Sequence, residues 1–116
     1  MIEQFQKMST EQLKASTNMI IHAGNAKSNA MEALNNAKQG HFKEAHRYLE
    51  KADDELIKAH NEQSALLTDE ARGDQIAITL LAVHSQDHLM LSAVYNDFVK
   101  SLVDVYQMIY HNAEER

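Results

Sequence analysis

Apolar side chains recur every three or four residues along three long stretches of the sequence, which is the spacing of one face of an α-helix. The first stretch opens at Ser9, which forms a capping-box pattern with Gln12. It ends at Gly40, a residue that readily takes the positive φ of a helix C-terminus. The second runs from about residue 41 to 67 and the third from about 78 to 110. We therefore predict three long α-helices.

Within the first two helices, the apolar positions indicate which face of each helix packs against the other helices. In the second helix they follow the i, i+3, i+4, i+7 spacing, and charged residues crowd the opposite face. A polar connection, residues 68–75, precedes the third helix, which Asp74 or Thr79 could cap. The positions expected to face the core are Leu13, Ile20, Ile21, Gly24, Ala30, Met31 and Leu34 in the first helix and Phe42, Ala45, Leu49, Ala52, Leu56 and Ala59 in the second.

The third helix is apolar on more than one face. Of the 27 residues in the range 76–102, 16 are apolar, and only Asp87, Asp97 and Lys100 carry a formal charge. A helix that is apolar all round must be buried on all sides, whereas a three-helix bundle buries only one stripe of each helix. We therefore expect the surplus apolar face to meet another copy of the same helix. The pattern does not fix the number of subunits.

The composition agrees with a single all-α domain, an antiparallel three-helix bundle over residues 1–116 with a short flexible segment at residues 1–9. The absence of proline and the presence of only three glycines argue against a β-rich fold, and the absence of cysteine excludes disulfides and thiolate sites. The net charge of −6 argues against binding nucleic acid or an anionic membrane. With no signal peptide or membrane span visible, we expect a cytoplasmic protein.

One short segment of the third helix, VHSQDHLM at residues 83–90, places polar groups among apolar neighbours. On a helical wheel, Asp87 lies about 60° and His88 about 40° from His84, so the three share one face. Gln86 lies nearly opposite, where it could cooperate only with His84 of another subunit. Three interpretations are open: polar groups satisfied within a core or groove, zinc ligands, or a nucleophilic histidine.

The nucleophile interpretation follows from the chemistry of imidazole. Its unperturbed pKa of about 6.5 lets one ring nitrogen carry a lone pair near neutral pH while the other holds a proton. A phosphoryl group can bond to the first nitrogen and leave again, and its transfer needs mainly positioning and charge stabilisation. Gln86 or His88 could donate hydrogen bonds to the phosphoryl oxygens. The remaining histidines are scattered and expected to be surface or partly packed residues: His22, His41, His46, His60 and His111.

The segment HSQDHLM, residues 84–90, closely resembles HAQDHLM, the active-site segment of the enzyme IIA component of the lactose/cellobiose branch of the bacterial sugar phosphotransferase system. The resemblance extends to IIHAGNAKSNAMEALNNAKQGHFKEA, residues 20–45, and to DELIKAHNEQSALLTDEARGD, residues 54–74. It covers about residues 10 to 110, with every motif in order. Ser85 in place of the common alanine is the one departure within the heptad.

This resemblance implies that His84 accepts a phosphoryl group from the histidine-containing phosphocarrier protein. His84 would pass the group to a cysteine of the cognate enzyme IIB, during uptake of a β-linked disaccharide such as cellobiose or lactose. The membrane would be involved only indirectly, through enzyme IIC. The resemblance also implies a homotrimer, assembled through the third helix, in which Gln86 and His88 line the phosphorylation site.

In such a trimer, Asp87 of each subunit would point to the threefold axis, and the three copies would bind a divalent cation. Three carboxylates that meet in an apolar interior would repel one another strongly. A cation with octahedral oxygen coordination, such as Mg²⁺, would relieve that repulsion. The resemblance thus accounts for a carboxylate in the most apolar helix of the chain.

Two other functions remain open. A histidine phosphotransfer domain of two-component signalling is also helical with one reactive histidine, but such domains usually show a His-x-Leu-Lys-Gly pattern, whereas Ser-Gln-Asp follows His84. A non-catalytic metal-binding helical scaffold would use the same polar residues without phosphoryl transfer. Phosphorylation by phosphoenolpyruvate, enzyme I and the phosphocarrier protein would separate the sugar-transport function from both.

Overall fold

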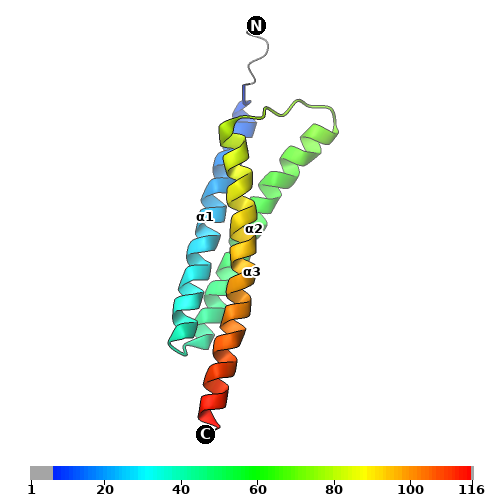
Figure 1. Cartoon of the computed structure of the whole chain (residues 1–116). Helices are drawn as coiled ribbons and strands as arrows, with labels where there is room; N and C mark the ends of the chain where they lie inside the picture. The colour runs from blue at the N-terminus through cyan, green and yellow to red at the C-terminus, as the bar shows by residue number, and fades with distance from the viewer. Residues whose placement is uncertain (1–6, 116) are drawn as a thin grey trace.

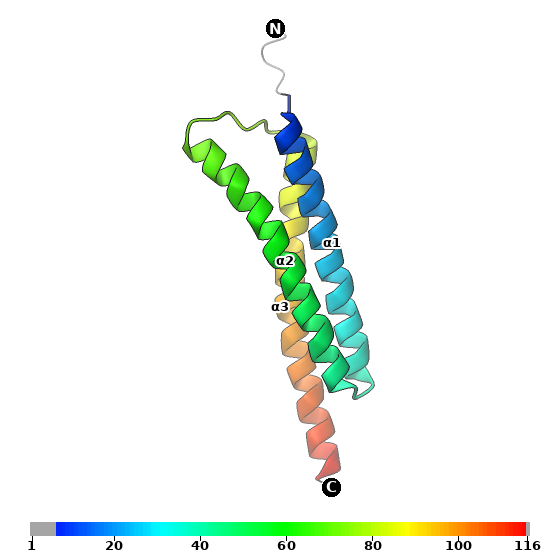
Figure 2. The same ribbon diagram turned by 180° about the vertical axis from the view of Figure 1, so that it is seen from behind.

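The computed structural model describes residues 7–115 and consists of three long α-helices, α1 (Thr10–Lys38), α2 (Phe42–Ala71) and α3 (Leu80–Glu114). Helices that follow one another in the chain are antiparallel (Figure 1). The described residues contain no β-strand, which confirms the predicted all-α bundle. α1 packs against both other helices, and the C-terminal half of α2 leans away from α1 and α3 (Figure 2). Of the segment expected to be flexible, residues 1–6 lie outside the described residues, and residues 7–9 are not helical.

Side chains cap the N-termini of α1 and α3. Ser9 Oγ accepts a hydrogen bond from the backbone N–H of Gln12 at 3.0 Å, as the capping-box pattern predicts. Thr79 Oγ1 accepts one from the backbone N–H of Ala82 at 3.1 Å. Of the two residues that could cap the third helix, Thr79 therefore does so, and Asp74 lies in the preceding connection.

Two helices are longer than predicted. α2 continues to Ala71 instead of ending near residue 67, and α3 continues to Glu114 instead of ending at Tyr110. The residues TDE that follow position 67 are polar and Ala71 comes next, but none of the four breaks a helix. The chain turns away from α2 only at Gly73, whose φ of 96° is left-handed. Polarity alone was therefore a poor signal for the end of the helix.

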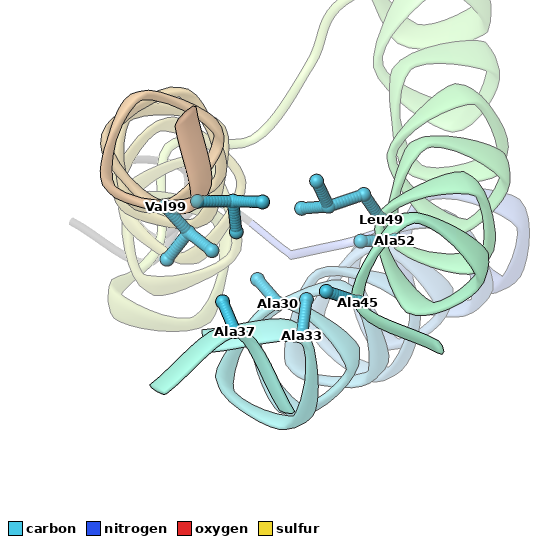
Figure 3. Packing of buried hydrophobic residues seen from close by; sticks show 8 residues of the cluster. Ala30, Ala33, Ala37, Ala45, Leu49, Ala52 and Val99 are labelled. Carbon is cyan, nitrogen blue, oxygen red and sulfur yellow. The ribbon is translucent and has the colours of Figure 1, made fainter. Parts of the chain in front are cut away.

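Alanine forms most of the seam through which α1 packs against its two neighbours. The seam positions are separated alternately by four and three residues, a period of 3.5 that is typical of helices wound in a left-handed coiled coil. Figure 3 shows Ala30 and Ala33 pointing from α1 towards the space between α2 and α3. Short side chains here let the helix backbones approach closely. The seam consists of Gln12, Ser16, Met19, Ala23, Ala26, Ala30, Ala33 and Ala37.

The predicted core face of α1 is wrong in its largest residues. Leu13, Ile21 and Met31 are 47%, 51% and 47% exposed. Of the rest of that set, Ala30 is buried, while Ile20, Gly24 and Leu34 are half-buried. From Ala23 to Ala37 every seam residue is alanine, so the helices approach closely there and a large side chain such as Met31 lies to one side.

The predicted core stripe of α2 is confirmed. Its residues also follow the alternating spacing of four and three, so they face α1 and α3 along the whole contact. The larger side chains at the edge of the stripe, Phe42 and Leu56, pack against the buried clusters. The fully buried members are Ala45, Leu49, Ala52 and Ala59.

α3 has one face in the core and an apolar face outside it, as the surplus of apolar residues predicts. One face is buried against α1 and α2 and consists of Ser85, Leu89, Ser92, Asn96, Val99 and Val103. The opposite face is exposed along most of the helix. We call it the outer seam, and its apolar residues are Leu80, Leu91, Val94, Phe98, Leu102 and Val105. No helix in the described part of the chain combines the length and hydropathy of a membrane span.

A polar pair links α1 to α2 outside the seam. His22 Nδ1 lies 2.6 Å from Glu55 Oε2. Partial burial raises the pKa of Glu55, but hydrogen bonds from His22 and Asn25 and the charge of Lys58 outweigh this effect. The pKa of Glu55 therefore lies below its usual value, and the carboxylate form is stabilised in the folded chain.

The buried face of α3 contains one amide, Asn96. Its Nδ2 donates a hydrogen bond to Asp53 Oδ1 of α2 at 2.8 Å, and Lys100 Nζ lies 2.8 Å from the same oxygen. A buried amide without any partner would be costly. The Asp53 carboxylate therefore makes it possible for an amide to occupy a position in an apolar seam.

The side chain of Gln12 in α1 holds the connection between α2 and α3. Gln12 is buried, and its Nε2 donates to Ala77 O at 2.7 Å while its Oε1 accepts from Ala77 N at 3.1 Å. Only half of the predicted capping box forms, because this side chain binds Ala77 instead of turning back to Ser9. The double hydrogen bond fixes the chain two residues before the Thr79 cap, and so fixes where α3 begins.

Tyr110, near the end of α3, packs over the turn between α1 and α2. Its hydroxyl donates to Lys38 O at 2.8 Å, and its ring lies edge-on to Phe42 with centroids 5.4 Å apart. Gly40 in this turn has a φ of 81°, as expected of a glycine that follows a helix. A Cβ at this position would lie 2.7 Å from Tyr110 Cε1.

We expect Gly40→Ala to lower the free energy of unfolding by at least about 1–2 kcal/mol, the cost of left-handed backbone for a residue with a Cβ. The matched control is Gly24→Ala, since nothing lies within 4 Å of a Cβ at that helical position. Alanine there should stabilise the chain by about 0.5–1 kcal/mol. Urea unfolding followed by circular dichroism measures both changes. Equal stabilities of the two variants would contradict this role of Gly40.

We expect Gln12→Leu to speed amide hydrogen exchange at Ala77 by at least about tenfold, because an unsatisfied buried backbone group costs about 1–3 kcal/mol. Gln75→Leu is the matched control, since Gln75 is exposed in the same connection. Exchange is followed residue by residue by NMR. If Ala77 exchanges no faster in Gln12→Leu than in Gln75→Leu, the side chain does not hold the connection.

Candidate functional site

The segment HSQDHLM begins one turn into α3, directly after the Thr79 cap and the first four helical residues. His84 and Asp87 are exposed on the outer seam, and Gln86 and His88 are half-buried on its two sides. The interpretation of these groups as polar residues satisfied within a core is therefore wrong for His84 and Asp87 in the single chain. A rigid helix instead presents the predicted nucleophile to solvent, where another protein can reach it.

The structure brings His84 and His88 together. Their ring centroids are 4.4 Å apart and the ring planes meet at 77°, so the edge of one ring faces the other. The four-residue spacing places both on the same side of the helix, as the helical wheel predicts. A group bound to His84 would therefore have a second imidazole beside it, which can donate a hydrogen bond.

Gln86 points to the other side of α3, towards α2. Its Oε1 accepts a hydrogen bond from Nε2 of Gln63 at 2.7 Å. The structure therefore separates Gln86 from His84 within one chain, in agreement with their nearly opposite positions on the helical wheel. Any joint action of the two must involve two copies of the chain.

Asp87 lies on the outer seam between Leu80 and Leu91, which are 86% and 70% exposed. Within residues 7–115 it forms no ion pair. In the described part of a single chain, no three acidic, histidine or cysteine side chains come close enough to hold a metal ion. A zinc site made by His84, Asp87 and His88 of one chain is therefore not supported. Carboxylate oxygens from several copies would suit a hard cation such as Mg²⁺.

Beside Gln86, the divergence of α2 from α3 leaves a cavity of about 170 Å³. Leu66, Val83 and Ser16 are among its lining residues, and most of the wall is apolar. Ser16 Oγ is buried there and has no hydrogen-bond partner among the described residues. Among the described residues, the Gln86 side chain is hydrogen-bonded to Gln63 and not to the polar residues of this wall.

Sequence reasoning did not single out Gln63. Its one signal is its position four residues after Ala59, which continues the core stripe of α2. An amide on such a stripe indicates a polar contact between helices, but the spacing does not identify the partner. The contact with Gln86 could be found only once both helices were placed.

The other histidines are surface or partly packed residues, as expected. His22 pairs with Glu55, and His46 Nε2 lies 3.2 Å from Gln107 Oε1. His111 pairs with Glu115, the residue after α3, at 3.0 Å. His41 and His60 are exposed.

The sequence matches a protein family over residues 14–107, and this family is described as the lactose/cellobiose-specific IIA subunit of the PTS system. The lichenan-specific phosphotransferase enzyme IIA component of Bacillus subtilis is 43% identical over 91 residues, which are 78% of this chain and 83% of that protein. The lactose-specific EIIA component of Streptococcus mutans is 38% identical over 89 residues, which are 77% and 86% of the two chains.

The fold is also similar to solved structures of IIA proteins. The cellobiose-specific enzyme IIA from Bacillus anthracis has a TM-score of 0.86 and 36% identity, over 90% of this chain and 95% of that one. In the IIA(Chitobiose)–HPr complex of the Escherichia coli phosphotransferase system, the matched chain has a TM-score of 0.70 and 28% identity, over 88% of this chain and 99% of that one. The chain therefore belongs to the lactose/cellobiose-specific IIA family of the sugar phosphotransferase system.

Proposed function

We propose that this protein is a phosphocarrier that accepts a phosphoryl group on His84 from HPr, the histidine-containing phosphocarrier protein. It passes the group to a cysteine of the cognate enzyme IIB during uptake of a β-linked sugar. The observation that carries this proposal is the exposure of His84 beside His88, within HSQDHLM on a rigid helix. The structural match to a IIA protein bound to HPr supports HPr as the donor. Relatives named for lichenan and lactose support the sugar class.

The transfer needs two displacements at phosphorus. In the first, the lone pair of an unprotonated ring nitrogen of His84 forms a bond to phosphorus, while the phosphorus–nitrogen bond to the histidine of HPr breaks. In the second, the cysteine sulfur of IIB forms a bond to phosphorus, and the bond to His84 breaks. The exposure of His84 suits both steps, because each partner must bring its own reactive atom to the same nitrogen.

The outer seam of α3 is the surface on which three copies would assemble. Its exposed leucine, valine and phenylalanine side chains follow the helix for most of its length, and burying them would supply the driving force for association. Asp87 lies within this seam, so three copies would meet at the threefold axis. A divalent cation such as Mg²⁺ bound there would neutralise the three carboxylates, and it takes no part in the transfer steps.

The other candidate functions have less support. A histidine phosphotransfer domain or a non-catalytic metal-binding scaffold would not account for a family match that spans all three helices. A phosphocarrier in sugar uptake would also have a cytoplasmic location and would contact the membrane only through enzyme IIC.

Incubation with phosphoenolpyruvate, enzyme I and HPr should add one phosphoryl group to the wild-type chain, as measured by mass spectrometry. The modification should be acid-labile, because a phosphorus–nitrogen bond hydrolyses in acid, and it should be absent in His84→Gln. His46→Gln is the matched control, since His46 is exposed at the opposite end of the bundle. Phosphorylation of His84→Gln at the wild-type level would contradict the assignment.

Asp87→Leu should abolish binding of Mg²⁺ and leave a trimer, because leucines at the axis can pack together without a cation. Asp97→Leu, which changes another exposed carboxylate of α3, should keep the metal. Sedimentation equilibrium gives the oligomeric state and isothermal titration calorimetry the metal binding. Wild-type protein that sediments as a monomer and binds no metal would rule out the axial site.

A further inference from the structure

We infer that Gln63 is a positioning residue for the phosphoryl site, because it holds the amide of Gln86 with its NH₂ group free to donate to a phosphoryl oxygen. This inference rests on the proposed function. Gln63 belongs to α2 and Gln86 to α3, so the contact ties the reactive segment to a different helix. Among residues 7–115, it is the one hydrogen bond that joins a side chain of α2 to the segment 84–90.

In the structure, the hydrogen bond to Gln63 leaves the NH₂ group of Gln86 available. A primary amide has an oxygen that only accepts and an NH₂ group that only donates. Gln63 Nε2 donates to Gln86 Oε1 at 2.7 Å, and Gln86 Nε2 has no partner among the described residues. A phosphoryl group carries oxygens that accept hydrogen bonds, so it is bound by the NH₂ group and repelled by the oxygen.

Gln63 is the residue of α2 that hydrogen-bonds the side chain of Gln86. α2 and α3 diverge beside Gln86, and the cavity between them is lined mainly by apolar side chains such as Leu66 and Val83. No backbone group of α2 takes the place of Gln63, since helical backbone groups are already bonded within the helix. Without Gln63, the Gln86 amide can adopt both orientations. The NH₂ group then faces the phosphoryl site in only a fraction of the molecules.

Gln86 cannot reach His84 of its own chain, because the two residues lie on opposite sides of α3. In the proposed trimer built on the outer seam, the side of α3 that carries Gln86 in one copy would adjoin the side that carries His84 in the next. Gln63 therefore acts on the histidine of a neighbouring copy, through the amide that it orients. It is not itself in contact with the phosphoryl group.

Two substitutions at Gln63 distinguish loss of its hydrogen bond from reversal of the Gln86 amide. Gln63→Met keeps the size of the side chain and removes the hydrogen bond, which should lower the rate of transfer from phosphorylated HPr about threefold. Gln63→Glu supplies a carboxylate that only accepts, so Gln86 must turn its NH₂ group towards α2 and its oxygen outwards. We expect this change to lower the rate about tenfold, in line with the loss of a hydrogen bond to a charged group. The loss should appear in kcat and not in KM.

A carboxylate at position 63 could also repel the phosphoryl group directly, and a second background excludes this explanation. In Gln86→Met there is no amide to turn, so Gln63→Glu and Gln63→Met should transfer at equal rates. Gln107→Glu is the matched control, since Gln107 contacts His46 at the other end of the bundle and should keep the wild-type rate. A tenfold gap between Glu and Met at position 63 that persists in Gln86→Met would overturn the positioning role.

The failures of the two proposals can be told apart. Wild-type protein that takes no phosphoryl group, or takes it elsewhere than on His84, removes the proposed function and this inference with it. Wild-type protein phosphorylated on His84, with unchanged rates in both Gln63 variants, removes the positioning role alone. Unfolding in urea checks that the variants are as stable as the wild type, so that a lost rate reports on the site.

Discussion

The close approach of the three helices along the alanine seam of α1 is the constraint on which the rest of the structure depends. Ala30, Ala33 and Ala37 leave room for neither a large side chain nor a gap, so α2 and α3 contact α1 at a fixed distance and angle. Apart from Met19, the larger apolar residues of α1 lie outside the seam. The seam thus sets both the compact core and the apolar character of the faces outside it.

The segment HSQDHLM is exposed in part because it lies along the outer seam of α3. Ser85 and Leu89 bury one side of α3 in the core, so His84 and Asp87 on the other side face outwards. The lean of α2 then opens space beside Gln86, where the core would otherwise close over it. The exposure of His84, its neighbouring imidazole His88 and the hydrogen bond to the Gln86 amide thus all follow from how α3 is packed.

The sequence predicts the three helices well and singles out His84 as the proposed phosphoryl acceptor, because both inferences depend on local patterns. Glycines, capping residues and the heptad around His84 can be read directly. The core face of α1 could not be predicted from the size of apolar residues, since Leu13 and Met31 are more hydrophobic than the alanines that displace them. The contact of Gln63 with Gln86 was also beyond reach, because it depends on the relative placement of two helices.

Heptad spacing has a weakness that the buried amide of α3 removes. A helix whose seam repeats every seven residues could slide by one repeat along its neighbours and still present side chains at every packing position. If α3 slid in this way, Leu89 or Val103 would replace Asn96 opposite Asp53, and the amide would be buried without its acceptor. Asn96 thereby selects a single alignment of α3 with its neighbours. This alignment also fixes the position of His84 along the axis of the bundle.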